Sequence, residues 1–316
     1  MNLRMMIIKL VCLLLSGIFA FSITHAQSTK AKSKAPKDIT TPKMALAKSG
    51  CCMEGPETVD GTSVDGAFME KAGTAEFGKL HEEPLPFTLE NPQGSDIIYN
   101  CKDNVPGRAY LIKSAKPSKS YLIVIQEWWG LNDHIKQEAE KLYAALGKDV
   151  NVIAVDLYDG KIASTVDSAQ KYIGEALKSK RKETILDGAL DFAGNGANVY
   201  TIGWCFGGMM SLQTAINSSE KVKGCIMYYG QPEKDEARIA NIKCDVLGIF
   251  GTQDRGISNA SVDEFAEKME KAGKKFKLVR YDAVHAFANP SNPGYNKEFG
   301  DDAFAKSVAF LKARIK

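Results

Sequence analysis

Short apolar runs alternate with longer segments of helical periodicity from about residue 95 to the end of the chain. The strand-like runs cover residues 121–125, 150–155, 198–202, 224–229, 246–250 and 277–281. Apolar residues at helical spacing predict helices over residues 134–146, 258–272 and 303–315. This alternation predicts an α/β fold with a mostly parallel central sheet and helices on both faces.

The first 50 residues have a different pattern. A basic start, an apolar run over residues 10–23 and the small-residue site Thr24-His25-Ala26 are typical of a secretory signal peptide over residues 1–26. The run is short for a transmembrane helix, although an uncleaved anchor stays an alternative. We therefore expect an exported protein, periplasmic or secreted, without stable membrane insertion after cleavage. Residues 27–50 are rich in Lys, Ser, Thr and Pro and are expected to form a flexible basic tether.

Residues 51–94 form an N-terminal extension that precedes the domain expected over residues 95–316. Four of its apolar residues could pack against that domain: Phe68, Met69, Phe77 and Leu80. The extension begins with Cys51-Cys52, which could form disulfides, bind metal weakly or stay reduced.

Three cysteines besides Cys205 lie within the domain expected over residues 95–316. Cys101 is a possible disulfide partner for the extension, but sequence does not fix connectivity. Cys225 and Cys244 lie within or next to strand-like runs and are expected to be buried and inert.

The composition limits the classes of function. The chain has 316 residues, 44% of them hydrophobic, which suffices for one large core plus an appendage. Its formal net charge is only +3, so nucleic-acid binding is not indicated. Neither a zinc-type spacing of Cys and His nor a glycine-rich phosphate loop occurs, and we expect no cofactor and no metal.

The segment Gly203-Trp204-Cys205-Phe206-Gly207-Gly208 carries the strongest chemical signal. It joins the strand-like run at residues 198–202 to a helix-compatible stretch at residues 209–215. Small residues two positions before and after a nucleophile are what a nucleophile elbow requires, because the strand-to-helix turn is tight. The helix N-terminus that follows would stabilise a thiolate and later an oxyanion. A glycine-rich turn with a buried cysteine is the alternative.

A cysteine nucleophile needs a base and an orienting acid, in the order nucleophile, acid, histidine on this scaffold. Asp254 follows the strand-like run at residues 246–250, where α/β sheets place their chemistry. His285 follows the run at residues 277–281, and of four histidines it alone comes after both Cys205 and Asp254. The order predicts a Cys-Asp-His triad.

These motifs, with Gln126-Glu127-Trp128-Trp129-Gly130, make residues 95–316 resemble the dienelactone hydrolase family, the cysteine branch of the α/β-hydrolase fold. The resemblance implies hydrolysis of a small-molecule ester or lactone through an acyl-cysteine. It implies that Cys205 is the nucleophile, His285 the general base and Asp254 its orienting partner. The backbone amides of Trp128 and Phe206 match the family's oxyanion hole.

The resemblance also assigns roles to residues around the triad. The glutamate that matches Glu127 takes the thiol proton when substrate binds, and the rings of Trp128 and Trp129 would raise its affinity for that proton. An exposed loop glutamate is the alternative. The substrate pocket is expected to include Trp129, Phe287 and Asn289.

One position departs from the family pattern. Family members that open dienelactone hold the substrate carboxylate with arginines, one of them four residues past the histidine, and here that position is Asn289. The sequence therefore predicts the reaction type better than the substrate. A non-catalytic or thiol-redox binding module on the same scaffold is the alternative function.

Overall fold

The computed structural model describes residues 63–315. The segments predicted over residues 1–26 and 27–50, together with Cys51 and Cys52, lie outside the described residues. Within residues 63–315 the chain forms one sheet of eight strands in the order β1-β2-β4-β3-β5-β6-β7-β8. The six strands from β4 to β8 in that order are parallel, whereas β2 pairs antiparallel with both of its neighbours, β1 and β4.

The strands are β1 Ser95–Tyr99, β2 Gly107–Ile112, β3 Ser120–Ile125, β4 Asn151–Asp156, β5 Asn198–Trp204, β6 Val222–Tyr228, β7 Asp245–Gly251 and β8 Phe276–Tyr281. The helices are α1 Val64–Ala72, α2 Ala75–Gly78, α3 Asp133–Ala145, α4 Val166–Leu177, α5 Arg181–Ala193, α6 Phe206–Asn217, α7 Glu236–Ala240, α8 Asn259–Lys271 and α9 Lys297–Lys312. None of the described helices is long and apolar enough to cross a membrane.

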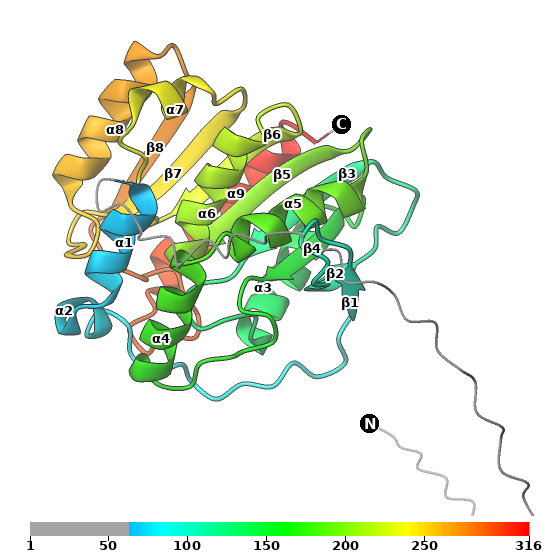
Figure 1. The fold of residues 1–316 in the computed structure, drawn as a ribbon, viewed down its shortest axis with the longest axis horizontal. Helices are drawn as coiled ribbons and strands as arrows, with labels where there is room; N and C mark the ends of the chain where they lie inside the picture. Colours follow the sequence, from blue (N-terminus) through cyan, green and yellow to red (C-terminus); the bar gives the residue numbers. More distant parts are fainter. Residues whose placement is uncertain (1–62, 316) are drawn as a thin grey trace, which may run out of the picture. The chain divides into compact units, whose positions relative to one another are not determined.

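Helices cover both faces of this sheet, as the alternating pattern predicts. In Figure 1, α6 lies in front of the sheet and α9, in red, lies behind it. Every residue of β4 is buried, and nearly every residue of β5. Central parallel strands are covered on both faces, which is why they read as continuous apolar runs.

The expected elements are present with small shifts at their ends. The largest shift is in the last helix, which begins at Lys297 rather than at residue 303. The Asn296 side chain caps this helix by accepting a hydrogen bond from the Phe299 amide. Phe299 is the one large apolar residue before Ala303 in this helix, and the ion pair Lys297–Asp301 lies beside it, so apolar periodicity does not mark these turns.

Part of the N-terminal extension packs onto the domain. Helix α1 lies beside α4, and both are seen at the lower left of Figure 1. Phe68 and Phe77 are buried in the core, and Met69 and Leu80 pack against it, which confirms the expected contact. We call residues 64–85 the N-terminal cover.

Polar contacts attach the cover at several points. Gln170 on α4 donates to the carbonyl oxygens of Ala72 and Thr74, at 2.9 and 3.1 Å. The buried ammonium of Lys182 lies 2.9 Å from the Asp65 carboxylate. These contacts join the cover to the helices on one side of the sheet.

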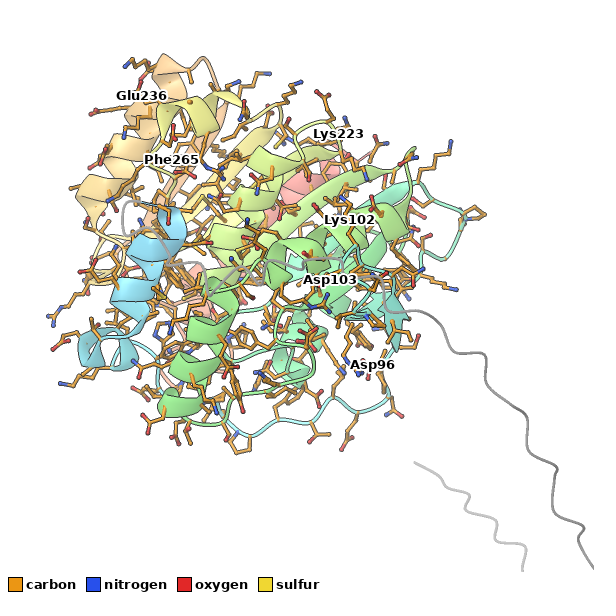
Figure 2. The ribbon with its side chains drawn as sticks, in the orientation of Figure 1. Asp96, Lys102, Asp103, Lys223, Glu236 and Phe265 are labelled. Carbon is orange, nitrogen blue, oxygen red and sulfur yellow. The ribbon has the colours of Figure 1, made fainter. Side chains whose placement is uncertain are left out.

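Figure 2 shows how the side chains divide between interior and surface. Phe265, on the side of α8 that faces the sheet, is buried, and its ring lies 5.1 Å from that of Phe276. Three of the labelled residues are exposed: Asp96, Lys223 and Glu236. The sheet side of α8 is therefore apolar, as the periodicity of residues 258–272 predicts.

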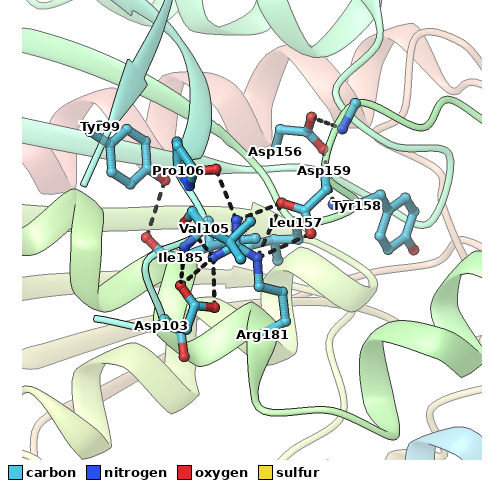
Figure 3. A network of polar contacts seen from close by, with 12 residues as sticks. Tyr99, Asp103, Val105, Pro106, Asp156, Leu157, Tyr158, Asp159, Arg181 and Ile185 are labelled. Atoms are coloured by element: carbon cyan, nitrogen blue, oxygen red, sulfur yellow. Dashed lines mark hydrogen bonds and ion pairs between the residues drawn. The ribbon is translucent and has the colours of Figure 1, made fainter. Parts of the chain in front are cut away.

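Arg181, at the start of α5, holds two loops together (Figure 3). Its guanidinium donates to the carboxylates of Asp103 and Asp159, at 3.0 and 2.7 Å, and to the carbonyl oxygens of Val105 and Pro106. The loop after β4 that is fixed in this way carries Tyr158. The Tyr158 ring stacks on Phe206, next to the nucleophile elbow, with centroids 6.0 Å apart.

Candidate active site

Cys205 lies at the sharp turn between β5 and α6, in the backbone geometry of a nucleophile elbow. Its φ is 52° and its ψ −113°, a strained conformation for a residue with a side chain. A Cβ at Gly203 would lie 2.2 Å from the Gly207 carbonyl oxygen, and one at Gly207 would lie 2.3 Å from the Gln126 carbonyl oxygen. Both glycines are required because the backbone segments approach so closely.

His285 and Asp254 form a buried pair beside the elbow. His285 Nδ1 lies 2.6 Å from Asp254 Oδ2, and neither side chain has exposed surface. The other Asp254 oxygen accepts hydrogen bonds from the amides of Gly256 and Ile257, at 2.7 and 2.9 Å. The carboxylate therefore orients the imidazole and leaves Nε2 as the ring nitrogen free for chemistry.

Glu127 lies just after the end of β3 and is buried, so the alternative of an exposed glutamate is wrong. One carboxylate oxygen accepts the Tyr229 hydroxyl at 3.1 Å, and the other accepts the Asn289 side-chain amide. The carboxylate is thus bonded to Tyr229 and Asn289, and its influence on Cys205 is electrostatic.

The residues expected around the substrate are all enclosed. Trp128, Trp129, Phe206, Phe287 and Asn289 are buried. The Trp128 ring lies 5.3 Å from that of Trp129, and Phe287 packs against the ring of Tyr229. The amide of Asn289 is engaged at both ends, since its oxygen accepts from Ser291.

A second histidine contacts the proposed nucleophile. His81 Nε2 lies 3.5 Å from Cys205 Sγ, and its Nδ1 lies 3.0 Å from the Phe77 carbonyl oxygen. A carbonyl oxygen only accepts, so Nδ1 carries the hydrogen and Nε2 directs its lone pair at the sulfur. His81 comes from the N-terminal cover, 124 positions before Cys205.

The cover closes the site with aromatic rings. The Phe77 ring lies 5.6 Å from that of Trp128 and 5.7 Å from that of His285, and Phe68 stacks on Phe206 at 6.2 Å. Cys205 is 0% exposed and His285 2%. A substrate can reach the sulfur only if some of these side chains move.

Burial and nearby charges shift the ionisation of the site. Burial raises the pKa of the Cys205 thiol, against the opposing influence of His285. Burial alone would lower the pKa of His285, but Asp254 and Cys205 raise it well above its usual value. Burial raises the pKa of Glu127 to about 7, although His285 and the Tyr229 hydroxyl oppose this.

The pKa of His81 is shifted in the opposite direction from that of His285. Burial, and then the charge of His285, lower the pKa of His81 well below its usual value. Two histidines beside one thiol are therefore held in different states, His285 favouring the cation and His81 the neutral ring.

The expected burial of two of the other cysteines is confirmed. Cys225 and Cys244 are buried and free. Cys101 is a free thiol of intermediate exposure. Its possible partners in the extension lie outside the described residues.

His81 and Tyr229 belong to the site although the sequence did not predict them there. His81 is one of four histidines in the chain, and it lies near the apolar residues expected to pack on the domain. Those signals suggest that this segment contacts the domain, but they do not indicate which part of the domain it contacts. Tyr229 carries no motif, and only the folded chain shows it bonded to Glu127.

Comparison with known proteins gives matches to the same region of the chain. The profile of the dienelactone hydrolase family matches residues 108–315. Protein usf of Aquifex pyrophilus is 28% identical over 220 residues, which cover 67% of this chain and 95% of that protein. A Saccharolobus solfataricus protein provisionally named carboxymethylenebutenolidase is 28% identical over 255 residues, covering 69% and 97% of the two chains.

A solved structure agrees at the level of the fold. The dienelactone hydrolase of Anabaena variabilis aligns with a TM-score of 0.53 and 17% identity, over 72% of this chain and all of that one. The family profile spans most of the domain that carries Cys205, Asp254 and His285. The chain therefore belongs to the dienelactone hydrolase family and is a hydrolase of the α/β-hydrolase fold.

Proposed function

We propose that this chain is an exported hydrolase that cleaves a small carboxylic ester or lactone through an acyl-cysteine intermediate. Cys205 is the nucleophile, His285 the acid and base, Asp254 its orienting partner and Glu127 the acceptor of the thiol proton. The observation that carries the proposal is the placement of Cys205, on a strained elbow beside a histidine that Asp254 binds at 2.6 Å. Export rests on the signal-peptide pattern of residues 1–26.

Activation begins with the thiol proton. The raised pKa of Cys205 keeps the resting thiol protonated, and the pKa of Glu127, about 7, suits a carboxylate that takes up a proton at neutral pH. To accept the proton, Glu127 gives up a hydrogen bond to Tyr229 or Asn289 as substrate arrives. The resulting thiolate is stabilised by the His285 imidazolium, which Asp254 supports.

Acylation follows at the substrate carbonyl. Sγ bonds to the carbonyl carbon, and the electron pair of the C=O bond moves onto oxygen, where the Trp128 and Phe206 amides stabilise it. When the carbonyl re-forms, the bond to the leaving oxygen breaks and His285 Nε2 protonates that oxygen. In a lactone the leaving oxygen stays attached, so the ring opens to a hydroxy acyl chain on sulfur.

Deacylation reverses these roles. His285, now neutral, takes a proton from water as the water oxygen attacks the thioester carbon. The C–S bond breaks, the carboxylic acid leaves, and the thiolate recovers its proton from Glu127. Every group returns to its starting state after one turnover.

The test is an activity screen with neutral esters and lactones, run on the full chain and on Cys205→Ala. Turnover should fall below detection in Cys205→Ala, because no other group forms the acyl intermediate. Cys101→Ser is the matched control, since it removes a thiol outside the site and should keep wild-type turnover. Intact-mass analysis after rapid quenching should place the acyl group on Cys205. A folded Cys205→Ala protein with near wild-type turnover would show that the mechanism is wrong.

A further inference from the structure

Three donor atoms from distant parts of the chain converge in the buried site. Each of three buried side chains offers one potential ligand atom, and these three atoms lie within 4.8 Å of one another: His81, Cys205 and His285. His81 comes from the cover, Cys205 from the β5–α6 turn and His285 from the loop after β8. Their separation in sequence explains why no metal-type spacing of Cys and His is visible.

Both imidazoles are oriented in the way that metal-binding histidines are. The Nδ1 of His81 faces the Phe77 carbonyl oxygen at 3.0 Å, and the Nδ1 of His285 faces the Asp254 carboxylate at 2.6 Å. Such oxygen partners fix the ring and leave the Nε2 lone pair for the ion. A carboxylate behind one ring also offsets part of the charge of a bound cation.

The His285 Nε2 is a second observation that points to a ligand. It is buried, it interacts with the Cys205 thiol, and it has no hydrogen bond of normal geometry among the described residues. Buried nitrogens are usually satisfied, so an unpartnered one at the centre of a site suggests an ion or ligand. The His81 Nε2 and Cys205 Sγ flank the same space, 3.5 Å apart.

We propose that His81, Cys205 and His285 bind one Zn²⁺ ion, which blocks the nucleophile and fastens the cover over the site. Two imidazole nitrogens and one thiolate form a donor set that suits zinc. Zn–S bonds of about 2.3 Å and Zn–N bonds of about 2.0–2.1 Å place tetrahedral ligands about 3.3–3.6 Å apart. The His81–Cys205 distance already fits, and the third ligand needs only a small shift.

Binding exchanges two protons for the ion. The S–H bond of Cys205 and the Nε2–H bond of the His285 imidazolium break and both protons go to solvent, while one Zn–S and two Zn–N bonds form. The coordinated sulfur cannot attack an ester, so zinc inhibits the hydrolase. That inhibition rests on the proposed function, whereas the metal site itself does not.

Cobalt absorbance tests the site without any ester. Co²⁺ is titrated into the full chain carrying Cys51→Ser and Cys52→Ser, which removes the two other thiols suited to metal. We expect one equivalent of Co²⁺ with a thiolate-to-cobalt charge-transfer band, displaced by Zn²⁺. Adding His81→Ala should weaken binding at least tenfold, and Cys205→Ser should abolish the band. His134→Ala is the matched control, because it removes a histidine outside the cluster and should leave binding unchanged.

The outcomes decide the two parts of the proposal separately. Absence of a stoichiometric band, or equal binding in the His81→Ala and His134→Ala proteins, overturns the site. If His81→Ala does not fold by circular dichroism, His81→Gln and Cys205→Ser are compared in the same way. Zinc that binds but leaves ester turnover unchanged overturns the inhibitory role. Absence of turnover in the metal-free protein would count against the proposed function and not against the site.

Discussion

The rings of Phe77 and His285 lie 5.7 Å apart with their planes inclined by 57°. Phe77 belongs to the N-terminal cover and His285 to the last loop of the hydrolase domain. The same phenylalanine also packs edge-on against Trp128, at 5.6 Å. One side chain of the extension therefore contacts both the proposed base and the ring of Trp128, whose backbone amide belongs to the proposed oxyanion hole.

Replacing Phe77 should open the site. In Phe77→Ala we expect Cys205 to react with iodoacetamide at least tenfold faster than in the wild type, because the ring that covers the site is gone. Removing a buried phenylalanine also costs about 3–5 kcal/mol of stability. The measurement is the alkylation rate of Cys205 by peptide mass analysis, at a temperature where the protein is folded.

Phe265→Ala is the control for that experiment. Phe265 is as buried as Phe77 but lies under α8, away from the site. It should lower stability by a similar amount without exposing Cys205. Equal alkylation rates in the two variants would mean that general loosening, and not the cover, limits access.

Glu127→Gln should reduce turnover about 10²-fold or more, because the amide cannot accept the thiol proton. In the wild type, kcat/KM should fall as pH drops below about 7, since the carboxylate with a pKa of about 7 becomes protonated. The variant should lose that dependence on pH. Glu140→Gln is the matched control, because Glu140 is a buried carboxylate that accepts a hydrogen bond from Tyr110 and is not among the charges that shift the pKa of Glu127. An unimpaired Glu127→Gln enzyme would leave His285 as the sole activating base.

The same carboxylate should also affect stability. The pKa of Glu127 rises from 4.5 to about 7 on folding, so the folded state binds this proton more tightly than the unfolded chain. The group therefore destabilises the fold as pH rises from about 4.5 through 7, by up to about 3 kcal/mol. Urea unfolding of the wild type and Glu127→Gln between pH 5 and 8 should show this loss in the wild type only. Parallel pH dependences in the two proteins would contradict the shifted pKa.

The preference of the enzyme for neutral or anionic substrates should depend on Asn289. Its amide donates to Glu127, and a neutral amide does not replace an arginine as a partner for a substrate carboxylate. Losing a charge-assisted contact of about 1.5–3 kcal/mol corresponds to about ten- to more than a hundredfold in discrimination. Neutral esters should therefore match or exceed carboxylate-bearing analogues in kcat/KM, measured on pairs of equal size. A strong preference for the anionic member would point to another cation in the pocket.

The elbow should not tolerate a methyl group at Gly203. The added Cβ would lie 2.2 Å from the Gly207 carbonyl oxygen, so Gly203→Ala should lose both activity and thermal stability. Gly174→Ala is the opposite case, since nothing lies within 4 Å of its Cβ in the middle of α4. That variant should gain about 0.5–1 kcal/mol. Thermal unfolding by circular dichroism distinguishes the two, and a stable, active Gly203→Ala protein would contradict the observed turn.

Sequence alone was informative where function depends on local geometry. The glycines around Cys205 mark a turn that only small residues permit, so the elbow could be located before the fold was known. Asp254 and His285 follow apolar runs that become β7 and β8, and parallel strands bring their carboxyl ends to one edge of the sheet. The order of these residues therefore predicted that they meet.

The tertiary structure decided what depends on contacts between distant segments. No local sequence feature predicts that His81 Nε2 lies 3.5 Å from Cys205 Sγ. The position of the cover depends on how Phe68 and Phe77 pack on the domain. The partners of Glu127 come from the loops after β6 and β8 and are not encoded beside it. Periodicity and motifs report local backbone preferences, whereas burial and ionisation arise only when separate parts of the chain exclude water together.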